Sequence, residues 1–145
     1  MKRVFLAILC CVLLIGSIPV ASFAAMGGGE IAVPLYNNTL MVNSRFSINS
    51  SGVATVTIMY VGKAGVTTGA TIVTKVEKQN ANGSWSIVDI DTEDDVWVDV
   101  TTKISLSTTH TVTVPRGTYR AVINYTIRGT GGAADTVEDI IEYTY

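Results

Sequence analysis

Apolar and polar residues alternate with a period of two along much of the chain after Val42. The clearest case is the stretch 115–129, in which the odd positions from Tyr119 to Ile127 are apolar and the even positions are mostly polar. Successive side chains of a strand point to opposite faces, so the pattern predicts a long strand with one buried and one wet face. Pro115 and Gly117 precede it and are typical of a tight turn.

Seven further segments carry strand patterns, separated by turn residues such as Gly, Asn and Ser. They are Val42–Asn49, Val53–Val61, Ala70–Gln79, Trp85–Ile90, Val96–Thr101, Ile104–Val114 and Ala134–Tyr145. No stretch of about ten residues shows the 3.6-residue period of an amphipathic helix. The sequence therefore predicts an all-β protein, an antiparallel two-sheet β-sandwich.

The run Gly117-Thr118-Tyr119-Arg120 resembles the tyrosine corner of immunoglobulin-like and fibronectin type III sandwiches. The chain as a whole resembles small, largely uncharacterised secreted immunoglobulin-like proteins of Gram-positive bacteria. This resemblance implies an immunoglobulin-like sandwich and an extracellular location, but no functional residue. The disulfide of immunoglobulin domains is not expected, because the two cysteines, Cys10 and Cys11, precede the strands. Trp85 is expected to supply a large aromatic to the core.

The first 25 residues have the three regions of a secretory signal peptide. Met1-Lys2-Arg3 is basic, the run from Val4 to Ile15 is almost wholly apolar, and small residues end at Ala24 and Ala25. We therefore expect a signal peptide over 1–25, a flexible lead-in over 26–41 and a sandwich domain over 42–145. The mature protein is expected to be secreted, with no membrane span after cleavage.

The charge balance argues against a nucleic-acid or anionic-lipid partner. The chain has 10 basic and 12 acidic residues, and loss of Lys2 and Arg3 with the signal peptide leaves eight basic residues. A net charge near −4 lacks the basic surface on which both kinds of binding depend.

Half of the acidic residues lie within the stretch 89–99, and such clusters can bind Ca²⁺ in exported proteins. The spacing matches a calcium loop only in its first three ligands, because position six is not Gly and position twelve is not Glu. The alternative is a solvated hairpin tip whose charges protect an edge strand from aggregation. The candidate calcium ligands are Asp89, Asp91, Glu93, Asp94 and Asp95.

No constellation typical of catalysis is evident, so the sequence predicts a protein that is not an enzyme. Paired catalytic carboxylates need a cleft and one raised pKa, which a polar acidic loop does not indicate. His110 is the only histidine, and no nucleophile elbow accompanies it.

Exposed aromatic residues are the better candidates for ligand binding. If Val96, Val98 and Val100 face the core, Trp97 points outward beside Asp99. Aromatic faces beside polar groups suit sugar and peptide ligands. The alternative is that the chain's own termini or an edge strand cover Trp97. The candidate ligand-binding residues are Trp97, Asp99, Tyr143 and Tyr145.

These observations favour a secreted, non-enzymatic binding or adhesion module whose partner is a protein or glycan at a cell surface. A self-assembling extracellular subunit that pairs through edge strands is the alternative. A carboxylate-based hydrolase is the third hypothesis, and it requires a pocket that gathers several of Asp89, Asp91 and His110.

Overall fold

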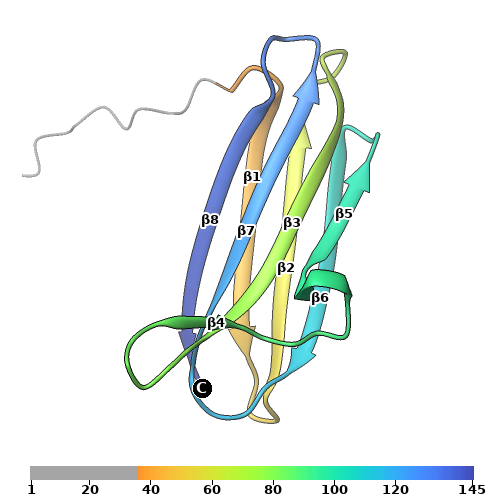
Figure 1. The fold of residues 1–145 in the computed structure, drawn as a ribbon. Helices are drawn as coiled ribbons and strands as arrows, with labels where there is room; N and C mark the ends of the chain where they lie inside the picture. Colours follow the sequence, from red (N-terminus) through yellow and green to blue (C-terminus); the bar gives the residue numbers. More distant parts are fainter. Residues whose placement is uncertain (1–35) are drawn as a thin grey trace, which may run out of the picture. The chain divides into compact units, whose positions relative to one another are not determined.

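The computed structural model describes residues 36–145, which form two antiparallel β-sheets packed face to face (Figure 1). The elements are β1 (Thr39–Ile48), β2 (Val53–Gly62), β3 (Thr67–Gln79), β4 (Trp85–Ile87), a 3-10 turn η1 (Glu93–Asp95), β5 (Trp97–Thr101), β6 (Ser105–Thr113), β7 (Thr118–Gly129) and β8 (Asp135–Thr144). No helix within the described residues is long and apolar enough to cross a membrane.

The sheet topology confirms the predicted all-β, two-sheet antiparallel sandwich. The smaller sheet has the strand order β1-β2-β6, and β1 and β2 form an antiparallel hairpin. The larger sheet has the order β4-β3-β7-β8, and β5 also pairs with β3. The long strand β7 lies between β3 and β8, so its apolar face is buried from end to end, as its alternation predicts.

The first strand begins at Thr39, inside the segment 26–41 that was expected to be a lead-in. The cause is a polar contact rather than an apolar pattern. The carboxylate of Asp135 accepts hydrogen bonds from the backbone N–H groups of Asn37 and Asn38, both at 2.7 Å. Asn38 is fully buried and its side chain donates to the carbonyl of Ala133 at 2.8 Å. The expected signal peptide over 1–25 lies outside the described residues.

Three tyrosines are the largest fully buried side chains of the core, and each hydroxyl has a hydrogen-bond partner. The hydroxyl of Tyr119 donates to the carbonyl of Pro115 at 2.6 Å, which confirms the predicted tyrosine corner. Tyr60 donates to the carbonyl of Lys103. Burial raises the pKa of Tyr60 and Tyr119, because it disfavours the charged phenolate.

The third tyrosine joins the two sheets through a chain of hydrogen bonds. The hydroxyls of Tyr125 on β7 and Ser44 on β1 lie 2.7 Å apart, and Ser44 donates to Asp139 on β8 at 2.6 Å. Since the Ser44 proton is used on the carboxylate, the Tyr125 hydroxyl is the donor to Ser44. The contact ties the edge strand of one sheet to two strands of the other.

The expectation that Trp85 lies in the core is wrong. Trp85 and its partner on β3, Gln79, lie at the outer face of the larger sheet, and the Arg120 guanidinium sits 4.4 Å from the centre of the indole ring. Arg120 also donates to Glu77 at 2.5 Å. Burial alone would raise the pKa of Glu77, but Lys75 and Arg120 outweigh it and lower this pKa. The tyrosines fill the core that a tryptophan was expected to fill.

Replacing Tyr119 with Phe keeps the buried ring and removes only the hydrogen bond to Pro115. We expect Tyr119→Phe to lower the free energy of unfolding by about 1 kcal/mol. Urea denaturation of the variant and the parent protein measures this difference. Tyr145→Phe is the matched control, because the Tyr145 hydroxyl binds the Ser50 carbonyl at 3.1 Å in an exposed position. If Tyr145→Phe lowers the free energy of unfolding as much as Tyr119→Phe does, the prediction that the buried Tyr119 hydroxyl contributes more to stability is wrong.

The Asp135 carboxylate predicts an acid-sensitive contribution to stability. Burial by itself raises the pKa of Asp135, but the N–H donors of Asn38 and Asn37 outweigh it, so the folded-state pKa is lowered. The stabilisation is therefore present above the unfolded-state pKa and is lost as pH falls through the folded-state pKa. We expect Asp135→Asn to lower the free energy of unfolding by about 1–3 kcal/mol at neutral pH. We also expect the free energy of unfolding of this variant to fall less steeply as the pH is lowered. Denaturation curves across pH test this, with the exposed Asp91→Asn as control.

Candidate functional site

The side chains of β5 alternate in the opposite sense to the one expected from sequence. Trp97 is half-buried and packs against the core, and Asp99 lies on the same inner face. Val98 and Val100 instead point outward and are 55% and 70% exposed. The expectation of an outward Trp97 beside three core-facing valines is therefore wrong, and its alternative, a Trp97 covered by the protein's own chain, describes the structure better.

His110 on β6, in the other sheet, contacts both inward side chains of β5, Trp97 and Asp99. The imidazole stacks on the indole ring of Trp97, with the ring centres 4.9 Å apart and the planes 7° from parallel. Its Nε2 lies 2.7 Å from the Asp99 carboxylate. The three side chains therefore connect the two sheets beside β5 and β6. An inward Asp99 is stable here because the imidazole satisfies its carboxylate.

The observed direction of β5 predicts unequal effects of neighbouring substitutions. Trp97→Ala is expected to lower the free energy of unfolding by about 2 kcal/mol or more, because it opens a gap beside the core. Val98→Ala removes an exposed side chain and is expected to stay within about 0.5 kcal/mol of the parent. Urea denaturation compares the two, and a larger loss for Val98→Ala would contradict the observed alternation.

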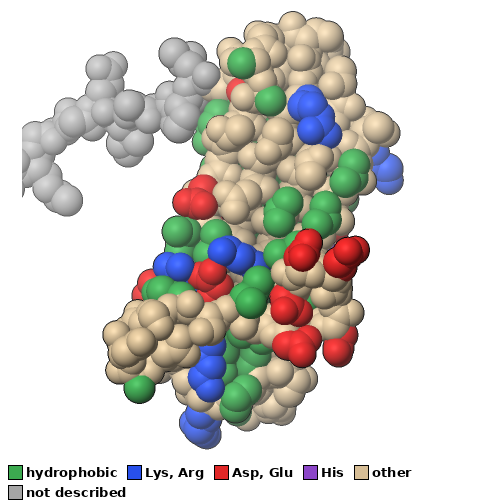
Figure 2. Space-filling model, viewed as in Figure 1, with side chains coloured by type: hydrophobic (Ala, Val, Ile, Leu, Met, Phe, Trp, Pro, Cys, Tyr) green, Lys and Arg blue, Asp and Glu red, His purple; other side chains and the backbone are tan. Residues whose placement is uncertain are grey.

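The acidic stretch forms a solvent-exposed turn between β4 and β5. Figure 2 shows acidic side chains gathered on this side of the molecule. Asp91, Asp94 and Asp95 all have positive φ angles, and Asp89 accepts a hydrogen bond from the Asp91 N–H at 3.0 Å. Within residues 36–145, no three His, Cys, Asp or Glu side chains form a group that could hold a metal ion. The calcium site over Asp89, Asp91, Glu93, Asp94 and Asp95 stays a prediction.

The two terminal tyrosines do not join Trp97. Tyr143 is partly exposed and meets Phe46 edge-on, with ring centres 6.4 Å apart. Tyr145 exchanges backbone hydrogen bonds with Gly117 and lies under the Arg116 guanidinium, 5.0 Å from the ring centre. Both tyrosines lie at the end of β8, so the four predicted ligand-binding residues do not form one surface.

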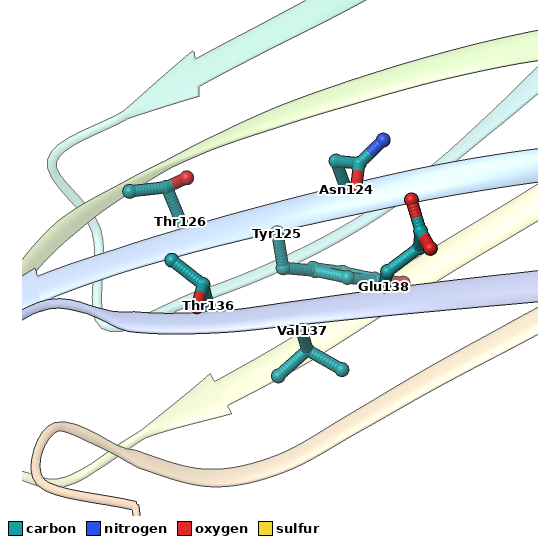
Figure 3. Close-up of a pocket in the computed structure, with 6 residues that line it drawn as sticks. All are labelled: Asn124, Tyr125, Thr126, Thr136, Val137 and Glu138. Atoms are coloured by element: carbon teal, nitrogen blue, oxygen red, sulfur yellow. The ribbon is translucent and has the colours of Figure 1, made fainter.

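A depression lies instead where β7 and β8 run side by side (Figure 3). Its volume is about 410 Å³, within the range of small-molecule sites. Asn124 and Thr126 come from β7, and their register partners Glu138 and Thr136 come from β8. These four polar side chains stand on the outer side of the sheet, and Tyr125 and Val137 complete the lining.

The four polar side chains of the depression make no hydrogen bond to another residue of the part 36–145 that the structure describes. Among the hydrogen bonds of the described residues, none involves the side chain of Asn124, Thr126, Thr136 or Glu138. Together they offer one carboxylate, one carboxamide and two hydroxyls, a set that both donates and accepts hydrogen bonds. Such a set is suited to a ligand that carries several hydroxyl groups.

Aliphatic side chains lie beside the depression on the same outer face. Val73 is the register partner of Asn124 on β3, and Ile140 follows Glu138 by two residues on β8. Ile140 is 49% exposed. Figure 2 shows that apolar and charged side chains are interspersed on this face of the molecule. A ligand with polar and apolar sides could contact both kinds of group.

Sequence reasoning identified Asn124 and Thr126 as part of a polar strand face but gave them no role. The strand alternation already separates them from the buried residues. It does not reveal that Thr136 and Glu138 lie opposite them, because that pairing depends on the register between β7 and β8.

A scan of protein-family models found no match to this chain, and a search of curated proteins likewise found none.

Proposed function

We propose that the protein is a secreted, non-enzymatic binding module that holds a saccharide in the depression between β7 and β8. The single observation that carries the proposal is the set of four polar side chains there that have no hydrogen-bond partner among residues 36–145. Saccharides present several hydroxyls that both donate and accept hydrogen bonds, and the Asn124 amide and Glu138 carboxylate complement them. Thr126 and Thr136 add two hydroxyls on the same face.

The aliphatic neighbours support a saccharide over a fully polar ligand. A sugar ring has C–H groups as well as hydroxyls, and two aliphatic side chains lie next to the lining residues, Val73 beside Asn124 on β3 and Ile140 two residues beyond Glu138 on β8. Recognition by a few placed polar groups beside an apolar surface is the usual arrangement of small-molecule sites.

The placement of the titratable groups favours binding over hydrolysis. A glycosidase needs two carboxylates on opposite sides of the scissile bond. The depression has one carboxylate, that of Glu138, among its lining residues. Asp89 and Asp91 are exposed in the acidic turn, whereas His110 lies between the sheets against Asp99.

The expected ligand can be found with a glycan array and measured by calorimetry. We expect Asn124→Ala and Glu138→Gln each to weaken binding of the selected saccharide by roughly tenfold, because each loses a hydrogen bond worth about 1–1.5 kcal/mol. Glu142→Gln is the matched control for Glu138→Gln, since it changes the same group on the same face of β8, four residues further along the strand. The control is expected to bind like the parent.

Two results would contradict the proposal. One is an array on which the protein selects no saccharide. The other is a selected saccharide whose affinity falls equally in Glu142→Gln and Glu138→Gln, which would place the site elsewhere on the sheet. Melting curves of all variants show whether a loss of binding reflects unfolding.

A further inference from the structure

The outward side of β5 exposes two valines to solvent. Val100 is 70% exposed, the largest value among the large hydrophobic residues described, and Val98 is 55% exposed. β5 pairs with β3 along one edge, and no strand of the described chain pairs with its other edge. An edge strand of this kind offers free N–H and C=O groups to another strand.

The charges at the two ends of β5 have opposite signs. The acidic turn, with Glu93, Asp94 and Asp95, comes directly before the strand. Lys103 is exposed just after it. Arg128 lies near the same end, because it donates to Thr71 at 2.9 Å and Thr71 is the register partner of Val100.

We propose that a second copy of this chain pairs with β5 in antiparallel fashion about a two-fold axis. Such an axis places the acidic end of each β5 beside the basic end of the other. If the axis passes at Val98, Val96 lies opposite Val100 of the second copy and Glu93 lies near its Lys103. The exposed valines then cover one another, and the two larger sheets form one continuous sheet.

The other free edge of the larger sheet does not fit a second copy. The outward residues of β8 are acidic on both sides of Ile140, namely Glu138 and Glu142. Antiparallel pairing of two β8 strands about Ile140 sets Glu138 opposite Glu142 of the second copy, and like charges at opposed positions are destabilising. β8 therefore carries one exposed aliphatic side chain between two like charges, whereas β5 carries two exposed valines between opposite charges.

The β5 dimer is independent of the proposed saccharide site. In the larger sheet, β3 and β7 lie between β5 and β8, so the pairing leaves the depression on β7 and β8 of each copy open. A dimer with two open depressions would bind a repeating polysaccharide more tightly than one copy does.

Sedimentation velocity of the protein, as it is recovered from the host that produces it, tests the pairing over a wide range of concentrations. We expect a monomer that converts to a dimer as concentration rises. Val98→Lys sets two ammonium groups against each other across the axis and is expected to weaken the dimer by roughly tenfold or more. Ile140→Lys is the matched control on β8 and is expected to leave dimerisation unchanged.

An exchange of charges tests the orientation. Lys103→Glu is expected to weaken the dimer, because it faces the acidic turn of the second copy. The double variant Glu93→Lys with Lys103→Glu restores opposite charges and is expected to recover part of the lost affinity. Amide hydrogen exchange is expected to slow along β5 as the dimer forms.

Three results would overturn the proposal. They are a monomer at every concentration, a dimer that Val98→Lys leaves intact while the variant stays folded, and a dimer that Ile140→Lys disrupts instead. None of them bears on saccharide binding, which the monomer can perform alone.

Discussion

Three buried tyrosine hydroxyls constrain how the two sheets of this sandwich pack. A buried hydroxyl without a partner costs free energy, so each tyrosine ring must end at an acceptor on another segment. Tyr119 reaches the Pro115 turn, Tyr60 reaches the Lys103 carbonyl, and Tyr125 reaches Ser44 in the opposite sheet. The described residues contain no cysteine, and of the three contacts the one between Tyr125 and Ser44 ties the two sheets together, as the disulfide does in immunoglobulin domains.

Polar contacts also hold the parts of the sandwich that the tyrosines do not reach. Asp135 binds the backbone just before β1, and Asp99 binds His110 between β5 and β6. Each carboxylate accepts hydrogen bonds from another strand or loop, Asp135 from the backbone before β1 and Asp99 from His110 on β6, so a carboxylate is tolerated on an inward strand face. Because β5 is held by its inner side chains, its two valines remain on the outside.

Both proposed binding surfaces lie on the larger sheet. The depression on β7 and β8 offers hydrogen-bonding groups, and the free edge of β5 offers apolar groups between opposite charges. These are different chemistries, suited to a small hydroxyl-bearing ligand and to a second strand respectively. Because β3 and β7 separate the two surfaces, the two proposals are compatible with each other in one molecule.

The period-two alternation by itself determined the all-β class, most of the strands and the buried face of β7, because a strand between two neighbours must bury one set of side chains. The run 117–120 likewise determined the tyrosine corner, since that motif is local. Tertiary structure alone decided which side chains of β5 face inward. Trp97 and Asp99 do so because His110, from the other sheet, contacts both of them. Tertiary structure also decided the depression, because the register of β7 and β8 brings Asn124 and Glu138 together.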